Sequence, residues 1–518
     1  MSGPATQFGE TSGGASTPQH GVERAWPFFS IIFLALAVPA LLRSVLRQNE
    51  NVFLLGARAR VDADFLPGDV FLHATAPVRA LSEWFAAPWV LWLPLVVAAL
   101  CLRLVLYAAF AGGLVSVVRQ LRLNPWLVAA IVVVMVRFPS FLAGEWMVGG
   151  VEAKAMAYPA VLLGLGAALR NRWVWAGFFL GLATSFHLLV GAWSSLAILG
   201  ALQWRGVGLD RLVKAGMAWL VGASIAIYGV LAVTGADPAT EGFPVTELVV
   251  YFRNPHHMAL GWDVEIWLWV LPVVAGVLAM IGVLCSKRSL DTERRLARFA
   301  LLVIAPLFVG ILAVRLPGGA SFLRLYPFRG EALFLLVSVL VVAARICRWL
   351  PGSLVRSGSV LAVGVLVVGL AVRVLPNQWS ALDAELGSYE RASANAATWQ
   401  WVRDNVPQDA VVLCAPDNGE ARHRMQRAVV VAFKGLPASG GGIERWYRRL
   451  VAMNGGVEPT QRGFEALDEI AAGFAERGDY RKLGREFGCA YAVVPSSRTD
   501  GLEVLFASGD LAVCRLPY

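Results

Sequence analysis

Long apolar runs, separated by short polar segments, occupy the chain from about Trp26 to Leu375. A hydrocarbon core about 30 Å thick needs about 20 apolar residues per helix, so each such run predicts a membrane-spanning helix. About eleven spans result from this criterion. They are expected near residues 26–46, 88–118, 126–139, 153–169, 173–187, 189–203, 215–233, 265–285, 299–315, 331–349 and 358–375. Residues 26–375 are therefore predicted to form an α-helical polytopic membrane domain.

Basic residues gather between these runs and give them a common orientation. The stretch from Trp173 to Gln203 is long for one helix and short for two. Split into two spans, it places the basic clusters on one face, as the positive-inside rule requires, whereas a single span would move every later cluster to the other face. We therefore expect a cytoplasmic amino terminus and a C-terminal segment outside the cytoplasm. The long loops 48–87 and 234–263 then also lie outside.

The pattern changes after the last apolar run. From Ser388 onward, a helix-like stretch and the strand-like runs AVVLCAP, AVVVAF, AYAVVP and LAVCRLP alternate with the amphipathic segments IERWYRRLVAMN and FEALDEIAAGFAERG. This alternation predicts a C-terminal α/β domain over residues 376–518. At the other end, residues 1–25 are rich in Gly, Ser, Thr and Pro and are predicted to be a disordered cytoplasmic tail.

Composition narrows the class of protein further. Apolar residues make up 57% of the chain and charged residues 16%, which is typical of a membrane protein surrounded by lipids. The net charge of +9 lies in the short clusters between spans, so no nucleic-acid partner is expected. The six cysteines lack a CxxC spacing that would hold zinc. One disulfide among Cys414, Cys489 and Cys514 is allowed if the C-terminal domain lies in an oxidising compartment.

The first outer loop is acidic and carries a recognisable motif. Its sequence, RQNENVFLLGARARVDADFLPGDVF, holds an acidic residue after the first span, then an aromatic residue, an Ala-Arg pair and an FLPGD stretch. This order resembles the first loop of GT-C glycosyltransferases, polytopic enzymes that use polyprenyl-phosphate-linked sugars. Further stretches resemble a bacterial branch with this architecture, namely VEAKAMAYPAVLLGLGAALRNRWVWAGFFLGLATSFHLLVG, LRLYPFRGEALF, WQWVRDNVPQDAVVLCAP, RAVVVAFKGLP and ERWYRRL.

The resemblance implies a location, a reaction and a base. It places the chain in the bacterial inner membrane, and implies sugar transfer from a polyprenyl-phosphate donor to an extracytoplasmic acceptor. Such enzymes use an outer-loop carboxylate as general base or to orient the acceptor, sometimes with a divalent cation, Mg²⁺ or Mn²⁺. Glu50 matches by motif position, although the common Asp-Glu pair reads Asn49-Glu50 here. Asp69, which closes the FLPGD turn, is the second candidate, and solvation of the loop is the alternative role, above all for Asp62 and Asp64.

Charges at the mouths of the spans add candidates for substrate binding. Glu152 and Lys154 precede and open the fourth span, where charges cost several kcal/mol unless paired or wet. They predict a polar cavity or a structural salt bridge. His187 lies between two apolar runs and is interpreted as a structural residue or as a donor to a lipid-linked phosphate.

Two further segments supply cations and histidines outside the membrane. Arg324 and Arg329 flank the turn that contains Tyr326, against the positive-inside trend, and guanidinium groups match phosphate oxygens. Contact with lipid headgroups is the alternative role. The loop around YFRNPHHMALGWD adds candidates on the acceptor side or at the membrane interface: Arg253, His256 and His257.

Two other classes of function compete with the glycosyltransferase. A transporter or flippase of a lipid-linked substrate would use buried charges as a path, but the sequence shows no inverted repeat and its polar loops lie mostly on one side. A noncatalytic scaffold in envelope polysaccharide assembly is the third class, because Asn49 replaces an acid of the family pattern. Expected partners are membrane lipids, a polyprenyl-phosphate sugar and an extracytoplasmic acceptor.

Overall fold

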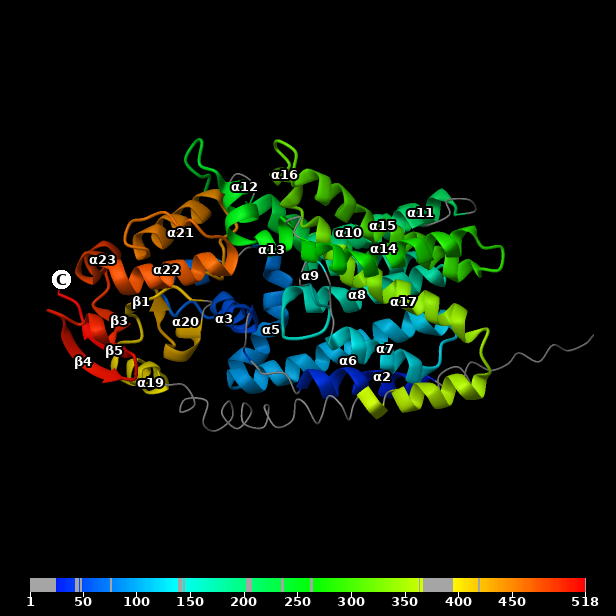
Figure 1. The fold of residues 1–518 in the computed structure, drawn as a ribbon, viewed down its shortest axis with the longest axis horizontal. Helices are drawn as coiled ribbons and strands as arrows, with labels where there is room; N and C mark the ends of the chain where they lie inside the picture. Colours follow the sequence, from blue (N-terminus) through cyan, green and yellow to red (C-terminus); the bar gives the residue numbers. More distant parts are fainter. Residues whose placement is uncertain are drawn as a thin grey trace, which may run out of the picture.

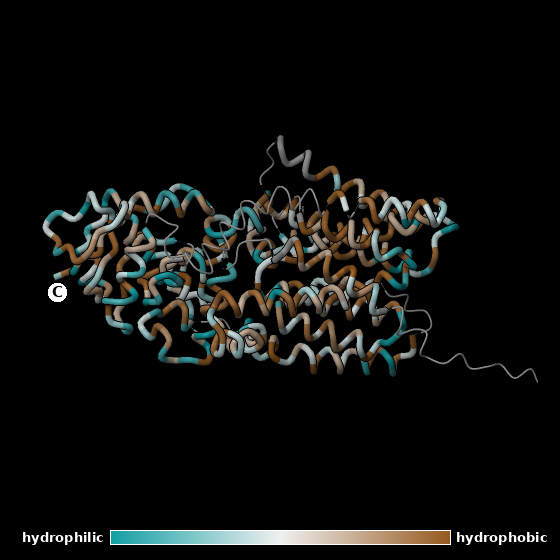
Figure 2. The backbone as a smooth tube through the Cα atoms, turned by 90° about the horizontal axis from the view of Figure 1, so that it is seen from below, coloured by the Kyte–Doolittle hydropathy of each residue, from teal (hydrophilic) through white to brown (hydrophobic). Residues whose placement is uncertain are grey.

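The computed structural model describes residues 25–41, 46, 49–74, 77–137, 142, 145–201, 207–233, 237–260, 264–362, 364–366, 395–417 and 420–517. Nearly all of the predicted tail and the predicted boundary near residue 376 lie outside these ranges. The molecule is elongated, with a bundle of long helices at one end and a small sheet domain at the other (Figure 1). Apolar residues dominate the bundle, and polar residues are more frequent over the sheet domain (Figure 2).

Helices occur at each position where the sequence predicts a span. Apolar runs without internal proline clusters satisfy their backbone groups within the helix, which lipid requires. The described helices are α2 Ala25–Leu41, α6 Leu95–Leu121, α7 Pro125–Arg137, α8 Ala153–Leu169, α9 Trp173–Phe186, α10 Leu188–Ala201, α11 Leu209–Val233, α14 Val264–Cys285, α15 Asp291–Ala313 and α17 Glu331–Cys347, followed by a helical segment at 352–362. The stretch 173–203 is indeed two helices, with the break at His187.

Fewer of these helices meet the length of a full span than the sequence suggests. Within the described residues, four are long and apolar enough to cross a membrane: Leu95–Leu121, Leu209–Val233, Asp291–Ala313 and Pro327–Cys347. The other apolar helices are 10–17 residues long by the same criterion. The total of eleven crossings therefore stays a prediction.

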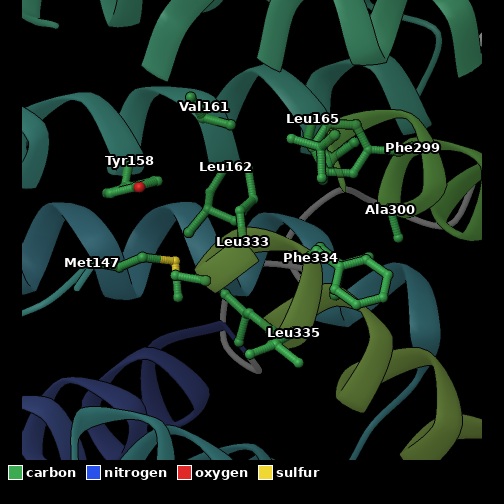
Figure 3. Close-up of a cluster of buried hydrophobic side chains, with 14 of the residues drawn as sticks. Met147, Tyr158, Val161, Leu162, Leu165, Phe299, Ala300, Leu333, Phe334 and Leu335 are labelled. Atoms are coloured by element: carbon green, nitrogen blue, oxygen red, sulfur yellow. The ribbon is translucent and has the colours of Figure 1, made fainter. Parts of the chain in front are cut away.

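The helices of the bundle pack through a continuous apolar core. In Figure 3, Tyr158, Leu162 and Leu165 of α8 face Leu333 of α17 and Phe299 of α15, all of them buried. Small residues let the backbones approach: a Cβ at Gly113 of α6 would come within 2.9 Å of a backbone carbonyl of α8. Close packing through glycines is typical of helices in membranes, where burial of apolar surface alone gives little drive.

One end of the bundle is basic. Arg295 Nη1 donates to Asn171 Oδ1 at 3.1 Å, so the α14–α15 turn lies beside the α8–α9 turn. Arg348 Nη2 lies 2.6 Å from Glu293 Oε1, which brings the end of α17 to the start of α15. Three of the loops predicted to be cytoplasmic thus lie together at one end of the bundle. Which side of a membrane this end faces stays a prediction.

The segments expected as outer loops contain helices of their own. The first loop forms α3 Asn49–Val61, α4 Val70–His73, the 3-10 turn η1 Pro77–Arg79 and α5 Ala80–Trp92. The later outer segments form α12 Val245–Glu247, the π-helix η2 Leu248–Arg253, α13 Pro255–Met258, α16 Ala320–Leu323 and the 3-10 turn η3 Pro327–Gly330. The predicted span 88–118 begins too early, because the backbone is extended at Leu93 and Pro94 and the long helix starts after them.

The C-terminal domain is a mixed sheet covered by helices. Its elements are α19 Ala396–Asn405, β1 Val411–Cys414, α20 Glu420–Met425, β2 Ala428–Val429, α21 Gly440–Met453, α22 Gly463–Arg477, α23 Tyr480–Phe487, β3 Tyr491–Pro495, η4 Ser496–Arg498, β4 Glu503–Ser508 and β5 Leu511–Arg515. The strand order is β2-β1-β3-β5-β4, and β1 runs parallel to β2 and β3 while β5 runs antiparallel to β3 and β4.

Alternation along the strands gives this sheet two buried faces. Leu413 belongs to a core that includes residues of α21, α22 and α23, whereas Val412 and Cys414 belong to a core that includes residues of α19 and α20. The α/β class predicted from the sequence is therefore confirmed for the described residues. The disulfide that the sequence allows is not formed, since Cys414, Cys489 and Cys514 are all free and buried.

The sheet domain and the membrane part share one of these cores. Phe71 of the first loop and Leu248 and Phe252 of the π-helix are buried among residues of α21 and α22, and the Phe252 ring lies 6.1 Å from that of Trp446. The C-terminal domain is thus fixed against the outer segments and does not hang from a linker alone.

Candidate functional site

A cluster of charged side chains lies where the first loop, the start of α8, the turn before α17 and the C-terminal domain meet. Its centre is Glu145, which is 1% exposed. Lys154 Nζ donates to Glu145 Oε2 and Arg329 Nε to Oε1, each at 3.0 Å, and His257 Nδ1 lies 4.0 Å from Oε1. Burial alone raises a carboxyl pKa, but the charges of Lys154, Arg329 and His257 hold that of Glu145 well below its usual value. Glu145 is therefore an ionised anchor for the cations around it.

Glu152 is the more accessible carboxylate of this cluster. It is the residue that precedes α8, its side chain is 12% exposed, and its Oε2 lies 3.7 Å from Lys154 Nζ. The Asn49 amide donates a hydrogen bond to it. Burial and the neighbouring Glu145 charge raise the pKa of Glu152, and they outweigh the opposing effects of Lys154 and Asn49. A solvent-reachable carboxylate with a raised pKa has the properties of a general base.

The turn before α17 holds an arginine against a neutral histidine. Tyr326 has φ +51°, a left-handed conformation that is strained for a residue with a side chain and recurs at functional sites. The Arg329 guanidinium lies 4.0 Å from the centre of the Tyr326 ring. Arg329 Nη1 is 2.5 Å from His187 Nε2, and because arginine only donates, this nitrogen accepts and the ring is neutral.

Arg253, the last residue of the π-helix η2, is a buried arginine of the cluster. Arg253 Nε donates to Phe433 O at 3.0 Å, and Nη1 to Asn254 Oδ1 at 3.4 Å. Burial lowers the pKa of Arg253 to about 10. π-helical turns are rare and are frequent at functional sites.

The two histidines that follow Arg253 form a stack with the C-terminal domain. The rings of His256 and His257 lie 4.1 Å apart, and the His256 ring lies 5.0 Å from that of Phe464. Burial lowers the pKa of His256 to about 4, so it is neutral at pH 7.

Lys434 enters the cluster from the C-terminal domain, and sequence analysis did not single it out. It is 8% exposed, and its Nζ lies 5.8 Å from the centre of the Phe464 ring. Burial, together with the nearby charges of Arg253 and Lys154, lowers the pKa of Lys434 to about 8, while Glu152 and Asp417 oppose this shift. The available signal was a single lysine directly after the apolar run AVVVAF, a position where a charge is rarely placed without a role.

The cluster as a whole has more buried positive than negative charge. It contains four cations and two carboxylates, namely Lys154, Arg253, Arg329, Lys434, Glu145 and Glu152. Counting Asp417, which lies beside Lys434, still leaves one cation in excess. Uncompensated buried charge is costly, so the cluster is arranged to receive an anion.

The two carboxylates predicted to act as bases are fully occupied by other groups. Glu50 is 1% exposed, accepts from Arg103 Nε and Nη2 at 2.9 and 2.6 Å, and also accepts from the backbone N–H groups of Leu46 and Val151. Val151 adjoins Glu152, so Glu50 fixes the backbone beside the accessible carboxylate. No lone pair is left in a position to take an acceptor proton.

Asp69 is occupied in the same way but at a different place. It is 0% exposed and accepts from Arg422 Nε and Nη2 at 2.6 and 2.9 Å, as well as from the backbone of Leu72 and Val429. Arg422 belongs to α20 and Val429 to β2, so Asp69 joins the first loop to the C-terminal domain. The assignment of either residue as a base stays a prediction that no described contact supports.

The remaining candidates lie outside the cluster. Arg324 is exposed, and nothing described places it near Glu145 or Glu152. Asp64 is exposed as well, and Asp62 is half-buried 3.7 Å from Arg58. These three agree with the alternative roles of headgroup contact and loop solvation.

A divalent cation does not fit this set of side chains. Among the described residues, no three His, Cys, Asp or Glu side chains are grouped so as to hold a metal ion. Glu145 is already paired with Lys154 and Arg329, and these two positive charges would repel a metal ion placed beside the same carboxylate. No chemical step is therefore assigned to a metal.

Comparison with protein families matches one segment of the C-terminal domain. A domain of unknown function, DUF6798, matches residues 394–453, which include Arg422 and Lys434. No curated protein matches the sequence significantly.

Solved structures give the fuller match. ArnT from Cupriavidus metallidurans bound to undecaprenyl phosphate aligns with a TM-score of 0.50 and 12% identity over 96% of this chain and 98% of that one. The apo state of the same protein aligns over the same shares with 12% identity and a TM-score of 0.47. The agreement spans the helical bundle and the C-terminal domain together. The match to the lipid-bound structure shows that this chain has a fold similar to that of ArnT.

Proposed function

We propose that this protein is an integral membrane glycosyltransferase of the GT-C type, which moves a sugar from a polyprenyl-phosphate donor to an extracytoplasmic acceptor. The observation that carries the proposal is the excess of buried cations beside one accessible carboxylate with a raised pKa. The relative with the same fold is bound to undecaprenyl phosphate, which supports a polyprenyl phosphate as the donor class.

The proposed reaction needs one proton transfer and one departing phosphate. Glu152 takes the proton of an acceptor hydroxyl, the acceptor oxygen forms a bond to the anomeric carbon, and the bond from that carbon to the phosphate oxygen breaks. The electron pair leaves with the phosphate as polyprenyl monophosphate. Glu152 ends protonated, and the cations of the cluster stabilise the charge on the leaving group.

Glu152 is preferred over Glu50 and Asp69 because of accessibility. Glu50 and Asp69 each accept two hydrogen bonds from an arginine and two from backbone N–H groups. Glu152 instead lies 3.7 Å from Lys154 Nζ, which is longer than a hydrogen bond, and its side chain is partly exposed to solvent. Lys154 and Asn49 orient it. Asn49, which replaces the first acid of the family pattern, thus retains a role as a donor to the base.

A transfer assay tests the function. Purified protein in lipid nanodiscs is incubated with undecaprenyl-phosphate-linked labelled sugars and envelope lipids as acceptors. We expect transfer by the wild type and a loss of about a hundredfold or more for Glu152→Gln, the usual range for removal of a general base. Glu241→Gln, which neutralises an exposed carboxylate of the second long loop, is the matched control and keeps the rate.

Three results would contradict parts of this proposal. Absence of transfer together with stabilisation by undecaprenyl phosphate would favour a transporter or scaffold. Absence of both would remove the donor class. Full activity of Glu152→Gln would remove only the assignment of the base.

A further inference from the structure

Lys434 differs from the other cations of the cluster in having no hydrogen-bond or ion-pair partner among the described residues. Lys154 and Arg329 both donate to Glu145, and Arg253 donates to Phe433 O and Asn254 Oδ1. Within the described ranges, Lys434 makes no hydrogen bond and no ion pair; its one contact of this kind is with the face of the Phe464 ring. Glu152 and Asp417 attract its charge from beyond ion-pair distance, so the burial of this lysine, which is 8% exposed, still costs free energy that a bound anion would recover.

The surrounding structure holds the Lys434 backbone in place. Directly after it, Gly435 has φ +90°, a conformation open to glycine, and a Cβ there would lie 3.8 Å from Val52 of α3. Directly before Lys434, the Phe433 carbonyl accepts a hydrogen bond from Arg253 Nε. The backbone N–H of Phe433 donates to Asp417 O at 2.8 Å. The lysine is thus fixed between the first loop and the π-helix, facing the charges of Glu152 and Lys154.

The charge of the leaving group changes during the proposed reaction. A polyprenyl-phosphate sugar is a phosphodiester with one negative charge, whereas the departing polyprenyl phosphate is a monoester that approaches two at neutral pH. A cation with no partner in the free protein can respond to this second charge, whereas a cation already neutralised by Glu145 responds less.

We infer that Lys434 contacts the donor phosphate and selectively stabilises the second negative charge that forms as polyprenyl phosphate leaves, which makes the C-terminal domain part of the catalytic site. This inference rests on the proposed function. It assigns to the DUF6798 segment a substrate-contacting residue, beside residues of that segment, such as Phe433 and Trp446, that share a core with Phe252 of the π-helix.

The test compares two lipids that differ by one charge, undecaprenyl phosphate and its methyl ester. We expect the wild type to bind the monoester about tenfold more tightly than the methyl ester, which corresponds to about 1.4 kcal/mol. Lys434→Met loses this preference, and its kcat falls more than its KM changes. Lys434→Arg keeps the preference. Lys482→Met, which removes an exposed lysine of the same domain, is the matched control and behaves as the wild type.

The outcomes separate this inference from the function on which it rests. If the wild type transfers sugar but Lys434→Met keeps the preference for the monoester, the inference is wrong and the function stands. If the wild type neither binds undecaprenyl phosphate nor transfers sugar, both fall.

A pH series on the wild type covers the case in which Lys434→Met does not fold. The preference for the monoester must then decline as the pH rises above about 8, where Lys434 loses its proton in the free protein. The groups that face it are Arg253, Lys154, Glu152, Asp417 and His256; of these, Arg253, whose pKa burial lowers to about 10, loses part of its charge only toward the end of the series. A preference that stays constant up to pH 10 would overturn the inference.

Discussion

The hydrogen-bond and ion-pair partners of each buried carboxylate determine which role that carboxylate can take. Glu145 and Glu50 are both 1% exposed and each is held by charged donors, while Glu152 is left with a partial pair and a route to solvent. Burial raises the pKa of a carboxyl group, and only close donors reverse this. The residue with the weakest pairing is therefore the one suited to exchange a proton.

This difference predicts a bell-shaped pH dependence of kcat/KM. A base must be ionised, so activity falls as the pH drops through the raised pKa of Glu152. Lys434 must be protonated, so activity falls again as the pH rises above about 8. Initial rates between pH 5 and 10 check both limbs. Lys434→Arg should move the alkaline limb upward, because arginine keeps its proton, and an unmoved limb would contradict the assignment.

The Glu50–Arg103 pair predicts a stability effect that is distinct from the loss of a base. Glu50→Gln leaves Arg103 buried without its charge partner, which costs about 3–5 kcal/mol. Adding Arg103→Met removes the stranded charge and should recover much of this loss. Thermal unfolding of both variants in detergent measures the difference. An unchanged melting temperature for Glu50→Gln would show that the pair is not formed.

Most residues of the site could be predicted from the sequence, but their pairing with one another could not. Lys154, His187, Arg253 and Arg329 all meet at the cluster, because charges at the ends of apolar runs have few places to be neutralised except against one another. Their pairing could not be predicted, since it depends on how distant segments pack. Lys434 was missed because its apolar run indicated a strand core and nothing else.

At the scale of the elements, short irregular helices between the spans build the site. The π-helix η2 ends at Arg253, and the 3-10 turn η3 begins after Tyr326 with its left-handed backbone. Tyr326 has this left-handed backbone although the proline that follows it favours an extended one. The turn places Arg329, three residues later, against Glu145. Neither element has a hydrophobic period, and for that reason the sequence predicted both stretches as loops.

The same scale explains which strands were predicted correctly. AVVLCAP and AYAVVP form the central pair β1 and β3, whose two faces are both buried. Of AVVVAF, only Ala428–Val429 pairs as β2, because the rest of the run packs under α21 as a buried segment. The edge strand Glu503–Ser508 was not predicted, although the apolar run VLFA lies within it.

The ion pair between Asp69 and Arg422 should stabilise the contact between the first loop and α20. Asp69→Asn removes the charge that holds Arg422 and is expected to destabilise the C-terminal domain by about 3 kcal/mol. Hydrogen exchange of the segment from Arg422 to Lys434 should then rise, because β2 also loses its contact to Asp69 through Val429. Asp64→Asn, in the same loop but exposed, is the control.

The contrary outcome is equally specific. If Asp69→Asn leaves exchange and thermal stability unchanged but abolishes transfer, Asp69 acts on the substrate directly, as the motif resemblance suggested.

At the scale of the whole molecule, charge is arranged along the long axis. Helix α8 runs from the cluster at Glu152 to the basic end at Arg170. Arg295, near the start of α15, and Arg348, after the end of α17, lie at that same end. The positive-inside rule then predicts that the basic end lies in the cytoplasm and the cluster outside.

Labelling of single cysteines in whole cells tests this sidedness. In a background with Cys285→Ala, an impermeant maleimide should label Asp64→Cys and Arg462→Cys in intact cells. It should label Lys287→Cys, at the α14–α15 turn, only after the cells are opened. The reverse pattern would place the cluster in the cytoplasm and end the proposal of an extracytoplasmic acceptor.

The position of the lipid phosphate in the bound protein decides most directly whether the charge cluster is the donor site. A structure determined with undecaprenyl phosphate in nanodiscs should show the phosphate within about 3 Å of Lys434 and of a second cation of the cluster, with Glu152 facing it across the space for the sugar. A phosphate bound instead among the arginines at the opposite end of the bundle, with the cluster unchanged, would contradict this.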